Sequence, residues 1–523
     1  MSDLPRVTYS NFDIDLAPVH AQFDALLPSF ERRELGQSHR SMIDGVSVNL
    51  AASPATITSP IDRNIVVGRV SPATADQVSE AVSAAAARAK SWAATPTAER
   101  IRLLRAFARE LAKRRFQLAL AALFEVGKSR IEAIGEAEEA VDLADYYATQ
   151  MEERQGYRQA LSQVRAGEIT ESLLLPFGVF AVVAPFNFPI ALSVNMLSAA
   201  LVTGNTVVFK PAPACSLSGR MIVEAALEAG IPPGALNLVL GGAQVGQALV
   251  SHPLVAGVAF TGSHDAGMQI ARAALSGGYA KPVIAEMGGK NPAYVTAHAD
   301  LDVAAQGVAR SAFGLQGQKC SACSVAYVEE AVKDAFIAKL QAVTATFKLG
   351  DPRAVDTFMG AVQSQATVDR FHAATEAAKQ QGRIIAGGHR ITEGALARGY
   401  FLQPTIAEFP APHRVTQEEL FMPYVAIRSA PSLASALAEG NAVKYGLAAG
   451  IYTRDPGELQ YFLDTVQAGV VYANRASGAT TGAWPGIQTF CGWKGSGVTH
   501  KGGLGPHFLP LFTHEQSRTL ILS

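Results

Sequence analysis

Three short segments place a thiol, a carboxylate and an amide next to predicted strands. Cys320 lies in a Gly-containing turn just before a strand, where its thiol can act as a nucleophile. Glu286 ends an apolar strand, where a carboxylate is costly unless it is paired or has a role. Asn187 follows another strand, and its amide can donate to a developing oxyanion. Together the three segments point to one reaction.

Each of these residues also has a structural explanation. A lone cysteine is more often a small buried apolar residue than a nucleophile. Glu286 can belong to a structural ion pair, and Asn187 can be a turn former or a helix cap. Two observations favour function. Lys319 precedes Cys320 and is expected to favour a thiolate, and the glycines at 288–289 let backbone approach a ligand.

Cys320 and Cys323 form a C-x-x-C, which is the spacing of a redox pair or of half a zinc site. No second C-x-x-C or nearby histidine pair in the sequence completes a metal site, so we expect no metal. Four cysteines in 523 residues do not make a disulfide scaffold, and their scarcity indicates a reducing compartment.

The elements that must position these residues alternate between strands and helices. Apolar residues recur every three or four positions over 73–94, 96–123 and 129–152, which predicts three helices. Strands are then predicted at 179–184, 206–209, 236–240 and 257–260, with helices at 189–202, 216–229 and 245–251. This alternation predicts a doubly wound parallel sheet that binds ligands at the carboxyl ends of its strands.

A second series of strands and helices is predicted from residue 282 to about residue 472, and it indicates a second α/β domain. It contains strands at 282–285, 292–295 and 324–328 and helices at 301–313 and 330–345. A strand at 166–175, a Gly-rich loop at 474–505 and a closing strand at 508–522 are also predicted.

Composition excludes several classes of protein. The chain is 49% hydrophobic and 17% charged, which is ordinary for two or three globular domains. A formal net charge of -1 offers no field for nucleic acid or an anionic membrane, so neither is expected as a partner. Residues 1–5 lack a basic start, and the apolar runs are interrupted before they reach membrane-spanning length. We therefore expect a cytoplasmic protein.

Six motifs follow one another along the chain with a specific spacing. They are the Asn187 segment, Lys210-Pro211, Phe260-Thr261-Gly262-Ser263, Glu286, Cys320 and Glu419-Leu420-Phe421. From about residue 50 to the C-terminus, this order resembles the aldehyde dehydrogenase superfamily. The resemblance implies an α/β fold with two doubly wound domains and a small β oligomerisation arm, and a homodimer or larger homo-oligomer.

The resemblance also implies domain boundaries. We expect an N-terminal arm at 1–45, a dinucleotide-binding domain at 46–157 and 179–285, a catalytic domain at 286–474, an oligomerisation arm at 158–178 and 500–523, and a substrate anchor loop at 475–499.

Catalytic roles follow from the same resemblance. Cys320 resembles the nucleophile that attacks the aldehyde carbon and forms a thiohemiacetal. Asn187 and the backbone N–H of Cys320 resemble the oxyanion hole. After hydride transfer to NAD(P), Glu286 resembles the base that activates water to hydrolyse the thioester.

A cofactor site is implied as well, with NAD expected and NADP possible. The residues expected to contact the cofactor are Phe186, Lys210, Pro211, Gly262, Ser263, Gly267, Glu419 and Phe421. Lys210 resembles the residue that holds the adenine ribose, and Gly262 and Ser263 resemble a pyrophosphate contact near a helix N-terminus. Many NAD-preferring members carry Glu where this chain has Pro213, which leaves the choice between NAD and NADP open.

A finer resemblance concerns the substrate. The segment from Gly317 to Ser324 and the loop from Asn474 to Pro506 resemble the 1-pyrroline-5-carboxylate (glutamate semialdehyde) dehydrogenases. The residues implied to bind the substrate are Ser321, Gly482 and Ala483 around its carboxylate and Phe490 on its methylene chain. Backbone N–H groups of a Gly-rich loop can form such an anion nest, although glycines that serve only turns are the simpler explanation.

The predicted reaction is the oxidation of L-glutamate γ-semialdehyde, in equilibrium with 1-pyrroline-5-carboxylate, to L-glutamate in proline catabolism. The alternatives are a dehydrogenase of another semialdehyde or of a hydrophobic aldehyde, a coenzyme-A-acylating enzyme, and a non-enzymatic protein with the same fold. Glu286 argues against the acylating enzyme, which typically lacks the base. The retention of Cys320, Glu286, Asn187 and Lys210 together argues against loss of activity.

Overall fold

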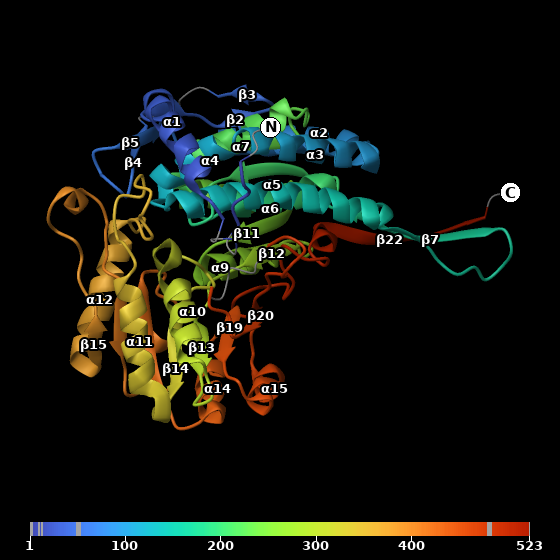
Figure 1. Cartoon of the computed structure of the whole chain (residues 1–523). Helices are drawn as coiled ribbons and strands as arrows, with labels where there is room; N and C mark the ends of the chain where they lie inside the picture. The colour runs from blue at the N-terminus through green and yellow to red at the C-terminus, as the bar shows by residue number, and fades with distance from the viewer. Residues whose placement is uncertain (1–3, 9–10, 12–13, 49–53, 478–483, 522–523) are drawn as a thin grey trace.

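The computed structural model describes residues 4–8, 11, 14–48, 54–477 and 484–521. Figure 1 shows two α/β bodies, one above the other, and a narrow β arm that extends away from both. Within the described ranges, no helix has the length and apolar character needed to span a membrane.

The first body is built on a seven-stranded sheet. Its order is β12 (Val283–Glu286), β11 (Val255–Thr261), β8 (Val179–Val183), β9 (Thr206–Lys210), β10 (Leu236–Leu238), β2 (Met42–Ile43) and β3 (Val46–Ser47). The strands from β12 to β10 are parallel, and β2 and β3 are antiparallel additions. The chain runs outward from β8 to β10 and returns to β11 beside β8, so the topological switch point lies between β8 and β11.

Two sequence predictions about this sheet disagree with each other. The alternation of strands and helices assigns the strand at 282–285 to the second series, which is wrong because β12 pairs in parallel with β11 of the first sheet. The domain boundaries implied by the resemblance instead end the first domain at residue 285. The pattern of apolar residues marks a buried strand without saying which sheet buries it. The carboxyl end of β12, where Glu286 lies, therefore shares an edge with the carboxyl ends of β8, β9 and β11.

Helices cover both faces of this sheet. Successive residues of each strand point to opposite faces, and both sets are apolar. Val179 and Ala181 belong to one apolar cluster with α2 (Ala75–Ala94), α8 (Ala243–Val250) and α9 (His264–Ala274). Phe180 and Val182 belong to another cluster on the opposite face. The helices of that cluster are α3 (Thr97–Lys113), α4 (Arg115–Val126), α5 (Arg130–Glu153), α6 (Ala191–Val202) and α7 (Ser216–Glu228). The helix predicted at 96–123 is thus two helices, separated at Arg114.

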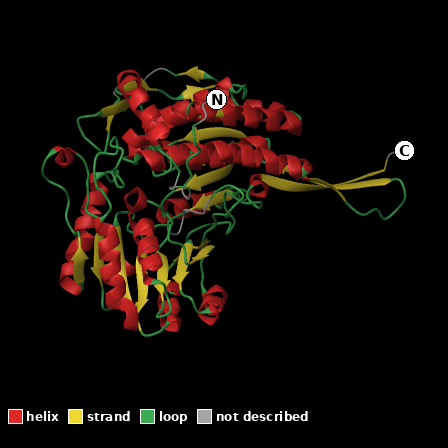
Figure 2. Cartoon of the chain, viewed as in Figure 1, coloured by secondary structure: helices red, strands yellow, loops and turns green. Residues whose placement is uncertain are grey.

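The second body contains another seven-stranded sheet. Its order is β15 (Arg383–Ala386), β16 (Thr405–Glu408), β17 (Tyr424–Ala430), β14 (Cys323–Glu329), β13 (Asn291–Val295), β19 (Ala448–Tyr452) and β20 (Val470–Ala473). All pairs are parallel except that of β15 with β16. Its helices are α10 (Leu301–Phe313), α11 (Lys333–Ala345), α12 (Gln365–Gln381), α13 (Arg414–Gln417), α14 (Leu433–Asn441) and α15 (Pro456–Thr465). Figure 2 shows these strands between layers of helices.

Smaller sheets complete the fold. The N-terminal helix α1 (Ala17–Glu34) buries Val19, Phe23 and Phe30 against the first body. After it, β1 (Gln37–His39), β5 (Val66–Val70) and β4 (Ala55–Thr58) form a three-stranded sheet, and β18 (Tyr445–Gly446) pairs with β21 (Trp493–Lys494). In the arm, β7 (Glu168–Pro176) lies between β6 (Arg158–Ala160) and β22 (Thr513–Ile521), and it pairs antiparallel with both.

Candidate active site

The carboxyl ends of β8, β9, β11 and β12 open into one cavity of about 440 Å³. The side chains and backbone that line it include the residues that follow each of those strands. They are Ala184, Pro185, Phe186, Asn187, Lys210, Ala212, Pro213, Phe260, Thr261, Gly262, Ser263, Ala266, Met287, Gly288, Cys320, Arg370, Glu419, Leu420 and Phe421. The switch-point edge of the first sheet thus meets the loops of the second body, as expected for a ligand site in a doubly wound fold.

Cys320 lines this cavity and also a second, smaller pocket. The turn before it runs through Leu315, Gln316 and Gly317 in left-handed backbone conformation, with φ values of 48°, 56° and 66°. A Cβ at Gly317 would lie 2.1 Å from the carbonyl oxygen of Met422, so only glycine fits there. This turn carries Cys320 out of the core and places it where the two cavities meet.

The environment of Cys320 favours the protonated thiol over the thiolate. Burial raises its pKa far above the ordinary value, and the carboxylates of Glu419 and Glu286 raise it further. The backbone N–H groups of Cys320 and Ser321 oppose this shift. A thiolate at Cys320 therefore requires that a base take its proton.

Lys319, the residue expected to favour the thiolate, forms an ion pair with α5. Its Nζ lies 3.4 Å from Oε1 of Glu132 on α5, and the backbone N–H of Leu315 donates to the same oxygen at 2.7 Å. Its charge helps to hold the Cys320 turn against α5 of the first body.

The two cysteines of the C-x-x-C have different environments. Cys323 is the first residue of β14, and it is buried in the core of the second body. Its backbone N–H donates to Oγ of Ser311 at 3.1 Å, and its thiol donates to the carbonyl of Val325 at 3.4 Å. Both cysteines are free thiols. The spacing therefore reflects a turn followed by a strand, with one thiol in a cavity and the other in the core.

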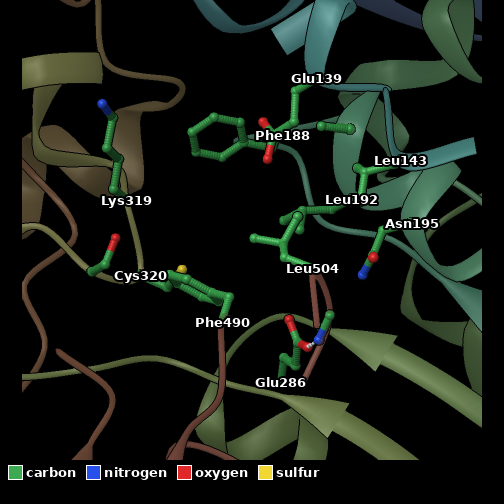
Figure 3. Close-up of a pocket in the computed structure, with 13 residues that line it drawn as sticks. Glu139, Leu143, Phe188, Leu192, Asn195, Glu286, Lys319, Cys320, Phe490 and Leu504 are labelled. Carbon is green, nitrogen blue, oxygen red and sulfur yellow. Dashed lines mark hydrogen bonds between the residues drawn. The ribbon is translucent and has the colours of Figure 1, made fainter. Parts of the chain in front are cut away.

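Glu286 reaches the smaller pocket from the end of β12. Its side chain is buried, and its Oε1 accepts a hydrogen bond of 2.9 Å from the backbone N–H of Gly503. Burial raises the pKa of Glu286 to about 7, while the Gly503 hydrogen bond opposes the shift. Figure 3 shows Glu286 and its bond to Gly503 on the opposite side of the pocket from Lys319. A carboxyl group with this pKa can exchange protons near neutral pH.

Asn187 connects the first body to the Cys320 turn. It is 3% exposed, and its Nδ2 donates to the carbonyl oxygen of Gln318 at 2.9 Å. Phe188, the next residue, lines the smaller pocket, whereas Asn187 lines the larger cavity together with Cys320. The side-chain amide and the thiol thus belong to the same space.

Helices α5 and α6 supply five of the thirteen residues that line the smaller pocket, and sequence reasoning missed their contribution. The pocket is lined by Glu139, Leu143, Phe188, Ala191, Leu192, Asn195, Glu286, Lys319, Cys320, Ser321, Phe490, Gly503 and Leu504. Figure 3 shows Leu143, Leu192 and Asn195 facing the Cys320 side across the pocket. The predicted residues Ser321 and Phe490 are among the lining residues, and Gly482 and Ala483 lie outside the described part of the chain. The one available signal was Asn195, an amide side chain in a mostly apolar helix.

On the other side of Cys320, most of the predicted cofactor residues line the larger cavity. Lys210 is nearly buried, its Nζ donates to the carbonyl of Pro211 at 3.0 Å, and burial lowers its pKa to about 8. Gly262 and Ser263 precede α9, whose N-cap is Ser263. An adjoining cavity of about 340 Å³ shares Lys210 with the first and continues past α8 and α9. Two linked cavities beside a helix N-terminus fit a dinucleotide.

Two of the predicted cofactor residues do not line either cavity. Pro211 contributes only the carbonyl group that Lys210 contacts. A Cβ at Gly267 would lie 2.4 Å from Sδ of Met287, so this glycine allows α9 to pack closely against Met287. Gly267 therefore does not line the cavity itself, but it leaves space for Met287, which does.

Glu419 and Phe421 come from the loop between α13 and β17. Oε1 of Glu419 accepts a hydrogen bond of 3.1 Å from the backbone N–H of Gly289, and burial raises the pKa of Glu419 to about 7. The ring of Phe421 packs edge-on against that of Phe186, with 5.8 Å between centroids. This pair joins the second body to the first across the mouth of the cavity.

A fold of this kind, with a dinucleotide cavity and a cysteine facing a buried glutamate, is matched by a known family. The model of the aldehyde dehydrogenase family matches residues 50–517, and the chain belongs to that family.

Individual relatives narrow the comparison. The chain is 36% identical over 518 residues to a 1-pyrroline-5-carboxylate dehydrogenase of Bacillus licheniformis, with 98% of each chain covered. It is 37% identical over 492 residues to 1-pyrroline-5-carboxylate dehydrogenase 2 of Bacillus subtilis, with 93% of each covered. A solved structure of 1-pyrroline-5-carboxylate dehydrogenase from Thermus with bound NAD superposes with a TM-score of 0.92 at 31% identity, and all of both chains is covered.

Proposed function

We propose that this aldehyde dehydrogenase oxidises L-glutamate γ-semialdehyde, the open form of 1-pyrroline-5-carboxylate, to L-glutamate with NAD in proline catabolism. The observation that carries the proposal is the position of Cys320 between a dinucleotide cavity and a pocket that contains Glu286. A nucleophile in that position can contact an aldehyde on one side and a hydride acceptor on the other. The names of the relatives support the choice of substrate.

Acylation begins at Cys320. A base first takes the proton of the Cys320 thiol. The thiolate then attacks the aldehyde carbon, and the resulting oxyanion is stabilised by Nδ2 of Asn187 and the backbone N–H of Cys320. The amide of Asn187 is held in place by the Gln318 carbonyl, which precedes the reacting thiol by two residues. When bound, the nicotinamide cofactor supplies the hydride acceptor for the oxidation, which leaves a thioester on Cys320.

Deacylation depends on Glu286. Because burial raises its pKa to about 7, this carboxyl group accepts a proton from water more readily than an exposed glutamate does. It also loses that proton easily at neutral pH, so it can act in every turnover. The Gly503 hydrogen bond orients the carboxylate within the pocket.

The cofactor site uses charge and backbone geometry. We assign Lys210 to the adenine ribose and Gly262 and Ser263 to the pyrophosphate, because free N–H groups at the start of α9 favour anions. Glu419 is assigned to the nicotinamide ribose, and Phe186 and Phe421 are assigned to the walls around it.

The substrate site combines an apolar wall with a polar end. Phe490 is assigned to the methylene chain and Ser321 to the carboxylate, together with Gly482 and Ala483, which lie outside the described residues. The leucines at 143, 192 and 504 also line the pocket. They favour a hydrophobic aldehyde as the alternative substrate.

Domain roles and assembly belong to the same proposal. Residues 46–157 and 179–285 are assigned to cofactor binding, 286–474 to catalysis and 475–499 to the anchor loop. The arm at 158–178 and 500–523 is assigned to a homodimer interface, because β22 is mostly exposed and extends from the body (Figure 2). The free thiols are consistent with the cytoplasm.

A substrate panel tests the proposal. Steady-state kinetics with NAD should compare glutamate semialdehyde with succinic semialdehyde and hexanal. Charge-assisted hydrogen bonds to the substrate carboxylate contribute about 1.5–3 kcal/mol each, so hexanal should be poorer by roughly a hundredfold or more in kcat/KM. Equal efficiency on hexanal and glutamate semialdehyde would leave the general dehydrogenase in place and refute the proposed substrate.

A further inference from the structure

The described N-terminal residues contact the helix that lines the aldehyde pocket. Figure 1 shows the dark blue N-terminal trace crossing α5. Val7 is buried against the first body, while the guanidinium of Arg6 forms ion pairs with Glu138 and Asp142 on α5. Nδ2 of Asn11 donates to the carbonyl of Arg6 at 2.7 Å, which fixes the backbone of this segment.

Asp142 also holds a residue from the other end of the chain. Its Oδ2 accepts a hydrogen bond of 2.7 Å from the indole N–H of Trp484, and its Oδ1 pairs with Arg6. Asp142 lies one turn after Glu139 and directly before Leu143, and both of those residues line the aldehyde pocket. One carboxylate therefore joins the N-terminal segment, α5 and the segment that begins at Trp484.

The segment after Trp484 forms a wall of the pocket. The N–H of Gly486 donates to the carbonyl of Leu504 at 2.9 Å, and the N–H of Phe490 donates to the carbonyl of Gly503 at 3.0 Å. Gly503 in turn donates to Glu286. A displacement at Trp484 is thus transmitted through two backbone hydrogen bonds to Phe490, Gly503 and Leu504, which all line the pocket.

We propose that Arg6 is a positioning residue for the aldehyde pocket, acting through Asp142 and Trp484 on the wall that carries Phe490. Arg6 orients the Asp142 carboxylate, and the carboxylate fixes the indole at the start of that wall. The N-terminal segment thereby sets how well the pocket fits its aldehyde. This inference rests on the proposed function only for the choice of the aldehyde used in the test.

A double-mutant cycle separates this role from general stability. Arg6→Met keeps the aliphatic stem and removes the charge, and Trp484→Phe keeps an aromatic ring and removes the N–H donor. KM for glutamate semialdehyde should rise about threefold in Arg6→Met and about tenfold in Trp484→Phe, with kcat within about twofold. Arg6→Met should have no further effect in the Trp484→Phe background, and Arg6→Lys should restore most of the fit.

Arg398→Met is the matched control. Arg398 pairs with Asp62 at 2.7 Å, and the side-chain exposures of 56% and 14% resemble those of Arg6 and Asp142 at 52% and 23%. This control should leave KM unchanged. The inference would be overturned if Arg6→Met and Arg398→Met changed KM equally. It would also be overturned if the effects of Arg6→Met and Trp484→Phe on KM multiplied in the double variant. If Trp484→Phe does not fold, Asp142→Asn takes its place in the cycle.

A second readout does not require the proposed substrate. Trp92 is buried, and Trp493 is 44% exposed. In Trp493→Phe, Trp92 and Trp484 remain, and Trp484 becomes accessible to a quencher if its indole is displaced from Asp142. In that background, Arg6→Met should increase quenching of tryptophan fluorescence by acrylamide, and Arg398→Met should not. Failure of the wild type to oxidise glutamate semialdehyde would refute the proposed function alone. Unchanged quenching in Arg6→Met would refute the positioning role.

Discussion

The two cavities that meet at Cys320 are built in different ways. The cofactor cavity lies at the carboxyl ends of β8, β9, β11 and β12, where backbone geometry and short loops supply most of the contacts. The aldehyde pocket is formed by the sides of α5 and α6 and by loop residues more than a hundred positions away in the chain. The first is a general property of a doubly wound sheet, whereas the second depends on how this chain packs its helices. We therefore expect substrate choice to depend on the second cavity.

Two buried glutamates, one in each cavity, illustrate the difference between the cavities. Burial raises the pKa of both Glu286 and Glu419 to about 7, and each accepts one backbone N–H. Glu286 lies in the aldehyde pocket, while Glu419 lines the cofactor cavity. A raised pKa by itself thus does not identify a base, because the role depends on which cavity the carboxylate faces.

The largest expected effect concerns the residue shared by the two cavities. Cys320→Ala should lower kcat by about a thousandfold or more, because no covalent intermediate can form. Cys323→Ala should keep most of the activity, because that thiol is packed in the core of the second body. Steady-state oxidation of glutamate semialdehyde measures both. The reverse order of the two variants would show that the nucleophile is Cys323.

The next effect separates the two buried glutamates. In Glu286→Gln, hydride transfer precedes the step that needs activated water, so one burst of NADH should appear before turnover falls by about a hundredfold or more. Rapid mixing with excess aldehyde measures the burst. Glu419→Gln is the matched control, and it should raise KM for NAD without producing a burst. Steady turnover at the wild-type rate in Glu286→Gln would contradict the assignment of the base.

A smaller effect follows from pH. Glu286 acts as a base only when it is deprotonated, and its pKa is about 7. The deacylation rate should therefore fall as pH decreases below 7, by about tenfold per pH unit once most of the carboxyl is protonated. Single-turnover hydrolysis of the preformed thioester between pH 5 and pH 9 measures this dependence. A midpoint near the ordinary value for glutamate would show that the group is not Glu286 in its buried state.

The smallest effect concerns the cofactor side. Pro213 lines the cofactor cavity, and its ring brings no negative charge toward a 2′-phosphate. The wild type should use NAD and tolerate NADP. In Pro213→Glu, kcat/KM for NADP should fall about tenfold through charge repulsion, with a change of less than about threefold for NAD. A strict requirement for NADP in the wild type would contradict this expectation.

Sequence patterns predicted the strands that position the cofactor cavity, whereas the cofactor residues themselves came from the resemblance. Lys210, Gly262 and Ser263 lie at or just after the ends of strands with clear apolar runs, and parallel strands bring their carboxyl ends to one edge. The same patterns placed the helices α2, α5, α6 and α10 close to their observed bounds. Local sequence carries this information because strand burial and helix periodicity are local properties.

The aldehyde half could not be predicted in the same way. Glu139, Leu143 and Leu192 lie on helices whose apolar spacing indicates core, and nothing in that spacing distinguishes a pocket from a packed interior. The sequence places Lys319 beside Cys320, but it does not show that the same side chain forms an ion pair with Glu132 on α5. Long-range partners of this kind depend on how the bodies dock.

By itself, the sequence predicted the chemistry: a cysteine nucleophile, a carboxylate base, an amide donor and a dinucleotide site at strand ends. Only the tertiary structure decided which cavity each group lines and that Asp142 joins Arg6 to Trp484. The reason is physical. Residue types and local periodicity encode reactivity and secondary structure, whereas the pKa of Glu286 and the shape of the pocket arise from burial among residues distant in sequence.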